Sequence, residues 1–210
     1  MKYRYIAIEG NIGSGKTTLS TMLAKHYDAK LVHEEFADNN FLPKFYAEPE
    51  RYAFPLELSF LADRYQQLKN LLSMQDMFQQ TIISDYIFAK SKLFARTTLK
   101  DAEYDLFQKL FDIIDLHLPP PDVLIYLHAP IQQLQRNIQQ RGRPYEQAIP
   151  DEYLEKVQQT YQQYIKQNLS KTIMIDMNEA DFVANPKHFD KLVAFLEKDY
   201  DYQTHYLALG

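Results

Sequence analysis

Apolar runs alternate with helical stripes along the chain. Five short runs rich in β-branched and aromatic residues predict strands, and they cover residues 3–9, 30–33, 81–84, 122–128 and 172–176. Elsewhere apolar residues recur at the spacing of one helix face, which predicts helices at 16–27, 49–72, 87–96, 102–118, 151–169 and 186–196, with another marked by Ile131, Leu134 and Ile138. Alternating strands and helices indicate an α/β fold around a parallel sheet.

The run at 122–128 shows no polar alternation. A continuous apolar strand is typical of a parallel sheet that is covered on both faces, so we expect a five-stranded parallel sheet flanked by helices. Residues 140–150 are polar and contain two arginines and a glycine, which predicts a loop. A length of 210 residues fits a single domain, 1–210, with this loop as a lid.

Composition and charge exclude several classes of protein. Hydrophobic residues make up 46% and charged residues 24%, which are ordinary globular values. A net charge of −5 argues against a nonspecific nucleic-acid coat. The absence of cysteine excludes disulfides and thiolate metal sites, and suits a reducing compartment. No window approaches the roughly 20 apolar residues of a membrane span. We therefore expect a cytoplasmic protein without nucleic-acid or membrane partners.

Residues 10–17 fit the phosphate-binding pattern G-x-x-x-x-G-K-[ST] without a mismatch, with a predicted strand before them and a helix after. Such a loop turns backbone N–H groups and a helix N-terminus toward phosphate oxygens. We expect Lys16 to reach the β- and γ-phosphates and the Thr17 hydroxyl to bind Mg²⁺. The predicted ATP-binding residues are Gly10, Asn11, Ile12, Gly13, Ser14, Gly15, Lys16, Thr17 and Thr18.

The rest of the sequence favours a phosphotransferase that acts on a small molecule, because it shows no guanine-specificity motif and no obvious Walker B acid pair. Glu34 and Glu35 follow the second strand, where a carboxylate faces the ligand crevice of a parallel sheet. One of them could orient or deprotonate an acceptor hydroxyl, unless both are solvated surface acids. Arg136, Arg141 and Arg143 form a cluster that suits phosphate oxygens, and a mobile lid is favoured over a solvated basic turn.

Together these motifs resemble the deoxynucleoside kinase family, from residue 4 to about residue 165. The resemblance is carried by IEGNIGSGK at 8–16, by Glu34 with DNNFL at 38–42, by FYAEPERYAF at 45–54, by residues 57–64 and by RGRPYEQ at 141–147. It implies a P-loop kinase fold with an Arg-rich lid, and a homodimer. It also implies transfer of the γ-phosphoryl group of ATP, with Mg²⁺, to the 5′-hydroxyl of a deoxynucleoside in nucleotide salvage.

The resemblance assigns roles to individual residues. Glu34 matches the base that acts on the sugar 5′-hydroxyl, and Glu35 stands where the family often has proline. The resemblance implies that Tyr46 and Glu146 hold the sugar 3′-hydroxyl and that Phe54 is an aromatic residue near the base. It also implies that Arg141 and Arg143 are lid arginines, and that Thr17 and Asp85 lie on the magnesium side. The bacterial members that the chain most resembles favour a purine, with deoxyadenosine first.

Two positions depart from the family pattern. Glu57 stands where the family commonly has a glutamine that hydrogen-bonds the base edge, and an ionised Glu offers acceptors only. Asp85 keeps a carboxylate, but the arginine that usually follows is missing, and Arg64 or Arg96 could compensate. Two other functions stay open. One is a nucleoside monophosphate kinase similar to thymidylate kinase, with Arg64 or Arg96 on the acceptor phosphate; the other is a nucleotide-binding regulator without catalysis.

Overall fold

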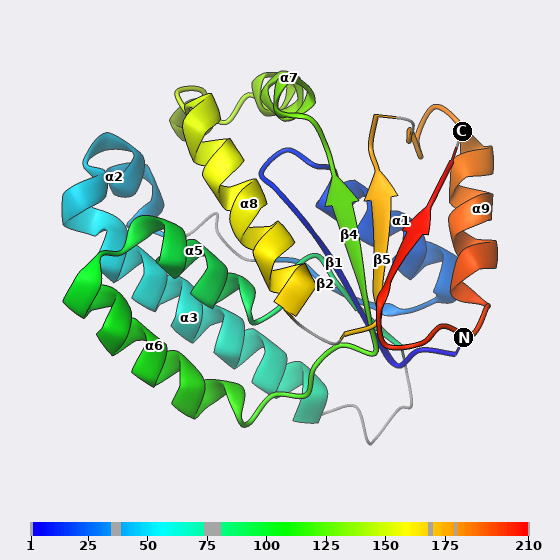
Figure 1. The fold of residues 1–210 in the computed structure, drawn as a ribbon, viewed down its shortest axis with the longest axis horizontal. Helices are drawn as coiled ribbons and strands as arrows, with labels where there is room; N and C mark the ends of the chain where they lie inside the picture. Colours follow the sequence, from blue (N-terminus) through cyan, green and yellow to red (C-terminus); the bar gives the residue numbers. More distant parts are fainter. Residues whose placement is uncertain (1, 35–38, 74–80, 168–169, 179, 210) are drawn as a thin grey trace.

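Six parallel strands form the centre of the computed structural model, which describes residues 2–34, 39–73, 81–167, 170–178 and 180–209 (Figure 1). The strands lie in the order β2-β3-β1-β4-β5-β6, and every neighbouring pair is parallel. Their bounds are β1 Tyr5–Gly10, β2 Lys30–Val32, β3 Ile82–Ser84, β4 Val123–His128, β5 Thr172–Asp176 and β6 Thr204–Leu207. The predicted α/β fold with a parallel sheet is confirmed.

Helices cover both faces of the sheet. In Figure 1, α1 and α9 lie on one side and α3, α5, α6 and α8 on the other. The bounds are α1 Lys16–Tyr27, α2 Leu42–Ala47, α3 Pro49–Ser73, α5 Lys90–Thr98, α6 Asp101–Asp115, α7 Ile131–Arg141, the 3₁₀ turn η1 Pro144–Glu146, α8 Asp151–Gln167 and α9 Pro186–Leu196. Most of the predicted helices are therefore present, with ends that differ by a few residues.

The alternation of side chains along β1 divides the interior into two cores. Ile6 and Ile8 pack into the core under α1 and α9, whereas Tyr5 and Ala7 pack into the core under α3, α5 and α8. All four residues are buried. Since successive side chains of a strand point to opposite faces, a strand that is buried on both faces must be apolar throughout. This requirement explains the continuous apolar runs in the sequence.

The sheet has one strand more than the five that the sequence predicts. The extra strand, β6, pairs with β5 at the edge of the sheet. Leu207 is its one buried residue, Thr204 and His205 are partly buried and Tyr206 is exposed, because an edge strand has little apolar surface to cover.

The sequence also does not predict the short helix α2. Its Pro43 indicates a turn in the sequence but stands in the first helical turn, where proline is tolerated.

The topology places a ligand crevice at the end of β1. This strand lies between β3 and β4, at the point where the strand order reverses direction along the sheet. Open α/β sheets bind ligands at the carboxyl ends of their strands beside such a switch point. The loop that follows β1 begins at Gly10 and leads directly into α1. The predicted phosphate-binding loop therefore lies at the crevice.

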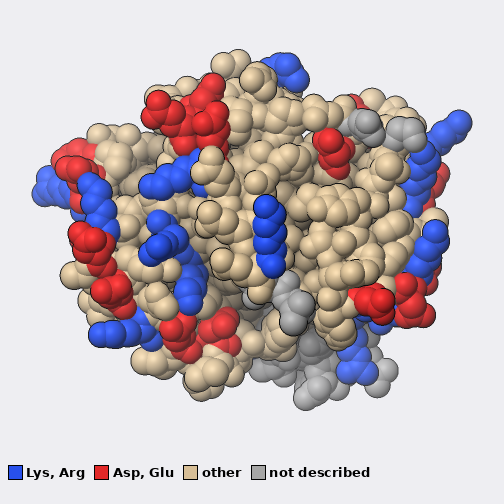
Figure 2. Space-filling view, viewed as in Figure 1, with Lys and Arg blue, Asp and Glu red and all other residues tan. Residues whose placement is uncertain are grey.

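The surface shown in Figure 2 carries charges of both signs. Lys and Arg side chains are interspersed with Asp and Glu on the part of this face that lies over α5 and α6. Within the described residues, no helix is both long enough and apolar enough to cross a membrane.

Candidate active site

The loop after β1 has the backbone conformation that its glycines permit. Gly13 has a φ of +80°, and an added Cβ would lie 2.8 Å from the carbonyl oxygen of Leu134 on α7. A side chain at this position would thus be strained and would also clash with α7. The Asn137 side chain donates to the Gly13 carbonyl at 2.7 Å. Helix α7 therefore holds the loop in place from outside.

Lys16 lies folded against the same loop. Its Nζ donates to the carbonyl oxygens of Gly10, at 2.8 Å, and Asn11, at 2.9 Å. Desolvation, with the nearby charge of Lys90 as the second cause, lowers the pKa of Lys16 to about 8. The Ser14 hydroxyl in the loop is buried without a hydrogen-bond partner. An ammonium group and an unpartnered hydroxyl beside the N-terminus of α1 fit a polyphosphate ligand.

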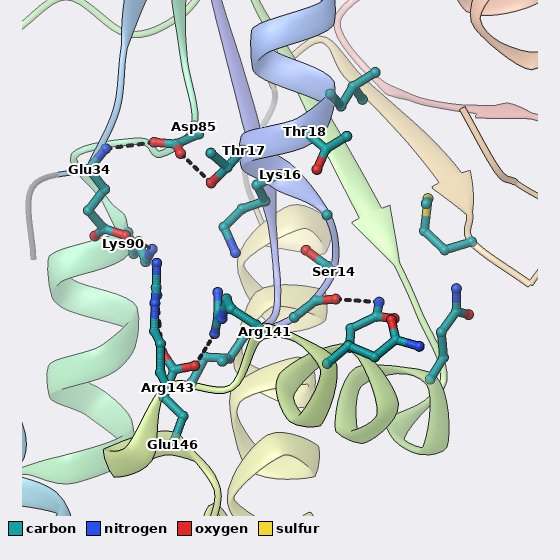
Figure 3. A pocket seen from close by; sticks show the side chains of 18 of the residues that line it. Ser14, Lys16, Thr17, Thr18, Glu34, Asp85, Lys90, Arg141, Arg143 and Glu146 are labelled. Carbon is teal, nitrogen blue, oxygen red and sulfur yellow. Dashed lines mark hydrogen bonds and ion pairs between the residues drawn. The ribbon is translucent and has the colours of Figure 1, made fainter. Parts of the chain in front are cut away.

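A chain of hydrogen bonds joins the phosphate loop to the end of β2 (Figure 3). The Thr17 hydroxyl donates to Oδ2 of Asp85 at 2.8 Å, and the backbone N–H of Glu34 donates to Oδ1 of Asp85 at 2.7 Å. Asp85 directly follows β3 and is buried. A hydroxyl and a carboxylate oxygen are ligands that Mg²⁺ accepts, and Mg²⁺ is usually held by few protein groups together with phosphates and waters. Thr17 and Asp85 therefore fit the predicted metal.

Glu34 is held between two cations. Arg64 on α3 donates to its Oε1 through Nη2 at 2.6 Å and Nε at 2.9 Å, and Lys90 on α5 donates to its Oε2 at 2.5 Å. Burial alone would raise the pKa of Glu34, but Lys90 and Arg64 outweigh it and lower the pKa to about 2. The carboxylate is therefore ionised at neutral pH, and it is fixed in orientation at the edge of the cavity.

A second carboxylate contacts the two lid arginines. Glu146, in η1, is buried and forms ion pairs with Arg141 and Arg143. Tyr46 of α2 stacks on Tyr145, with ring centroids 6.0 Å apart. Tyr46 and Glu146, which the family resemblance pairs in one role, therefore lie in the same part of the molecule. Figure 3 shows Glu146 and the arginines below the phosphate loop.

Most of the predicted site residues line one cavity of about 740 Å³. Those that line it are Ile12, Gly13, Ser14, Gly15, Lys16, Thr17, Thr18, Glu34, Tyr46, Glu57, Asp85, Arg141, Arg143 and Glu146. The predicted ATP-binding residues Gly10 and Asn11 do not line it, although their carbonyl oxygens accept hydrogen bonds from Lys16. Phe54 and Arg136 do not line it either. Phe54 packs against a core, and Arg136 is exposed on α7. Their assigned roles stay predictions, as does that of Glu35, which lies outside the described residues.

Four residues of α7 line the cavity, and they are Gln133, Asn137, Gln140 and Arg141. Separations of four, seven and eight residues place them on one helix face. Arg136 lies at the edge of this face, three residues after Gln133 and four before Gln140, but its side chain is exposed and does not line the cavity. The sequence motif gives the position of an arginine along the helix but not the direction of its side chain.

The structure also shows site residues that the sequence did not indicate. Lys90, which forms an ion pair with Glu34, also lies over the ring of Phe94 at 5.5 Å. Phe60, Phe94 and Tyr153 supply aromatic walls to the cavity. Phe60 lies within the family motif at 57–64 but was given no role, and Lys90, Phe94 and Tyr153 lie outside the motifs. These residues come from three helices that meet only in the fold.

The fold and this site define a P-loop phosphotransferase for a small acceptor. A phosphate loop opens onto a cavity that contains an ionised, oriented carboxylate and several cations, as phosphoryl transfer requires. The sequence profile of the deoxynucleoside kinase family matches residues 6–199. The chain belongs to the deoxynucleoside kinase family, as the sequence motifs predict, and is an ATP-dependent phosphotransferase.

Individual relatives agree with this assignment. A deoxyguanosine kinase from Bacillus subtilis is 35% identical over 199 residues, which cover 92% of this chain and 96% of that protein. A deoxyadenosine/deoxycytidine kinase from the same organism is 31% identical over 91% of both chains. A structure of a deoxyadenosine kinase from M. mycoides with bound dATP matches with a TM-score of 0.81, at 23% identity, over 93% of this chain and 100% of that chain. This last likeness concerns the fold.

Glu57 is a buried acid in the cavity wall, and its pKa is raised above the ordinary value of a glutamate. Its exposed fraction is 2%. Desolvation raises its pKa from 4.5 to about 7, against the opposing effects of Arg64 and of the hydrogen bond from Thr98. A raised pKa in the folded state means that folding favours the protonated acid. Its contribution to stability is therefore complete below pH 4.5 and decreases as the pH rises toward 7.

We expect the substitution Glu57→Gln to remove this pH dependence. The free energy of unfolding of the wild type, relative to that of the variant, should fall by about 2 kcal/mol between pH 5 and pH 8, since one pKa unit corresponds to about 1.4 kcal/mol. Urea unfolding of both proteins at the two pH values measures the difference. The control is Glu50→Gln, at an exposed position of the same helix, which should show the same pH dependence of unfolding free energy as the wild type. If the difference in unfolding free energy between the wild type and Glu57→Gln is constant across this pH range, Glu57 titrates normally.

Proposed function

We propose that the protein transfers the γ-phosphoryl group of ATP to the 5′-hydroxyl of a purine deoxynucleoside, in nucleotide salvage. The observation that carries this proposal is the position of Glu34, in the same cavity as the phosphate loop and joined to it through Asp85 and Thr17. The names of the B. subtilis relatives both include a purine, which is deoxyguanosine in one and deoxyadenosine, beside deoxycytidine, in the other, and this supports a purine acceptor. The absence of cysteine suits work in a reducing cytoplasm.

On the donor side, the phosphate loop holds the triphosphate and Lys16 contacts its β- and γ-phosphates. Thr17 and Asp85 hold Mg²⁺, which when bound neutralises charge on the phosphates. Arg141 and Arg143, in the lid of residues 140–150, stabilise the charge of the transferring group. Their planar guanidinium groups suit paired phosphate oxygens, and both line the cavity that the loop opens onto.

On the acceptor side, Glu34 accepts a hydrogen bond from the 5′-hydroxyl and directs its oxygen toward the γ-phosphorus. A carboxylate with a pKa near 2 is a weak base. It is sufficient here, because the transition state of phosphoryl transfer is loose and the hydroxyl loses its proton late. Orientation is therefore the larger part of its contribution. Tyr46 and Glu146 hold the 3′-hydroxyl at the other side of the sugar.

A monophosphate kinase fits the site less well. Such an enzyme needs an arginine for the acceptor phosphate, and the sequence offers Arg64 or Arg96. Arg64 is engaged with Glu34 and Ser91. Arg96 is exposed and stacks on Tyr104, with 4.9 Å between its guanidinium carbon and the ring centroid. Because Arg64 is paired with the proposed base, a hydroxyl acceptor is favoured over a phosphate.

Glu34→Gln should lower kcat by about 100-fold or more, in the range that positioned acid–base groups contribute. The amide cannot take the proton, and its NH₂ group cannot accept hydrogen bonds from Lys90 and Arg64. The affinity for ATP should stay near that of the wild type, since Glu34 does not contact the phosphate loop directly. A coupled assay of ADP formation and calorimetric titration of ATP measure the two quantities.

The matched control is Glu50→Gln, which changes an exposed carboxylate on α3 and should leave both quantities unchanged. Turnover of the Glu34 variant within a few-fold of the wild type would refute the assigned role. Nucleoside monophosphates belong in the same assay, because their use as acceptors would favour the monophosphate kinase instead.

We further propose that Lys90 takes the place of the arginine that the family usually has after the carboxylate at Asp85. Lys90→Met should lower kcat by roughly 100-fold, as loss of a cation at developing charge does, and Lys90→Arg should restore part of the activity. Lys92→Met is the control, because Lys92 pairs with Asp112 and lies over the ring of Phe111, and it does not line the cavity. Equal kcat values for Lys90→Met and wild type, with both folded by circular dichroism, would exclude this role.

The assembly that we propose is a homodimer built on α6. Four apolar side chains of this segment are between 36% and 86% exposed, and they are Leu106, Leu110, Ile113 and Leu116. Their spacing forms one exposed stripe beside the face that carries the buried Phe107 and Phe111. We expect Leu106→Glu with Ile113→Glu to convert the dimer to a monomer. Analytical ultracentrifugation decides, and a monomeric wild type would overturn the proposal.

A further inference from the structure

One carboxylate oxygen in the cavity wall has no partner in the protein. Glu57 lines the cavity from α3, and its Oε1 accepts a hydrogen bond from the Thr98 hydroxyl at 2.8 Å. Its Oε2 is buried without any hydrogen-bond partner. Because an unpaired buried polar atom is costly, such an oxygen in a ligand cavity indicates that a ligand supplies the missing donor.

The surroundings of Glu57 suit a flat heterocycle. Leu56, Phe60, Phe94 and Tyr153 line the same cavity and supply apolar and aromatic surface. Glu57 also lies two helical turns before Arg64, which holds Glu34, and this corresponds to roughly 10 Å along the helix axis. A molecule that places a hydroxyl at Glu34 and extends along α3 therefore brings its far end to Glu57.

We propose that the Glu57 carboxylate binds the N1–H and 2-amino groups of guanine, so that deoxyguanosine is preferred to deoxyadenosine and the pyrimidine deoxynucleosides. This inference rests on the proposed function and names the acceptor of that site. A flipped or free base is recognised through hydrogen bonds to its pairing edge. On that edge guanine presents two adjacent donors, whereas adenine and cytosine present one donor beside an acceptor, and an ionised carboxylate only accepts.

The charges around Glu57 set the pH at which this recognition operates. The titratable groups that face it are Arg64 of α3, Lys90 of α5, Glu34 after β2, Tyr46 of α2 and Tyr153 of α8. Arg64 favours the carboxylate, but burial opposes it more strongly and raises the pKa to about 7. Above this pH the side chain offers two acceptors, which match guanine. Below it the protonated acid offers a donor and an acceptor, which match adenine.

The test compares kcat/KM of the wild type for deoxyguanosine, deoxyinosine and deoxyadenosine at pH 6 and pH 8. Deoxyinosine keeps N1–H and the 6-oxo group but lacks the 2-amino group. At pH 8 we expect deoxyguanosine to exceed deoxyinosine by about 10-fold or more, as loss of a hydrogen bond to a charged group does. The ratio of deoxyguanosine to deoxyadenosine should fall by about 10-fold or more at pH 6, where most of Glu57 is protonated.

Glu57→Gln separates recognition by charge from recognition by shape. An amide can pair with N1–H and the 6-oxo oxygen of guanine and hypoxanthine alike, or with the pairing edge of adenine. In this variant deoxyguanosine and deoxyinosine should therefore become equal within a few-fold, deoxyadenosine should improve by about 10-fold, and the pH dependence of the ratio should disappear. Glu50→Gln should behave as the wild type.

The outcomes distinguish this inference from the proposed function. If the wild type phosphorylates no deoxynucleoside, the proposed function fails and the assignment of Glu57 fails with it. If deoxynucleosides are phosphorylated but deoxyinosine equals deoxyguanosine at pH 8, or a pyrimidine or deoxyadenosine is preferred there, only the assignment of Glu57 is overturned. These wild-type measurements decide the question even if the Gln variant does not fold.

Discussion

The ion pairs of Glu34 with Arg64 and Lys90 are the interaction on which the arrangement of the site depends. Taking a carboxylate and two cations out of water is costly, and close geometry with several hydrogen bonds must offset that cost. Here each carboxylate oxygen receives a charged donor, and these contacts join the end of β2 to α3 and α5. Removing Glu34 would leave two buried cations without their carboxylate, and removing either cation would leave one oxygen of Glu34 without its charged donor. The acceptor side of the cavity is therefore fixed in the folded protein before any ligand arrives.

The same network reaches the phosphate loop, because Asp85 accepts hydrogen bonds from both Glu34 and Thr17. The loop is fixed independently by the close approach of α7 at Gly13. The two reacting ends of the site thus rest on opposite neighbours of β1: Asp85 follows β3, and α7 follows β4. A twisted sheet with a tightly packed interior transmits little relative motion between its strands. It is therefore a suitable base for holding a hydroxyl in line with a phosphoryl group.

What the sequence reveals depends on how far apart the interacting residues are along the chain. The phosphate loop is contiguous with β1 and α1, so its pattern alone predicts both its structure and its chemistry. Glu34 was found because it follows a strand, and family motifs brought in Tyr46, Asp85 and Glu146. Lys90 had no such marker, since its partner lies 56 residues away and the contact exists only after α5 packs. Phe54 and Arg136 were assigned from motifs that give the position of a residue along its helix but not the direction of its side chain. The sequence does not predict β6, because this strand lies at the edge of the sheet and has no continuous apolar run.

The cations of this mildly acidic chain explain how it can hold phosphate without a basic surface. In the structure Arg141 and Arg143 are paired with Glu146, and Lys90 and Arg64 with Glu34. A triphosphate must therefore compete with carboxylates for the arginines, which lowers its affinity but also excludes weaker anions. Glu57 is a different case, because one of its oxygens keeps no protein donor. Glu34 and Glu146 balance cations, whereas Glu57 is left to interact with the ligand. A departure from the family pattern at this position therefore bears on the choice of base rather than on the transfer of phosphate.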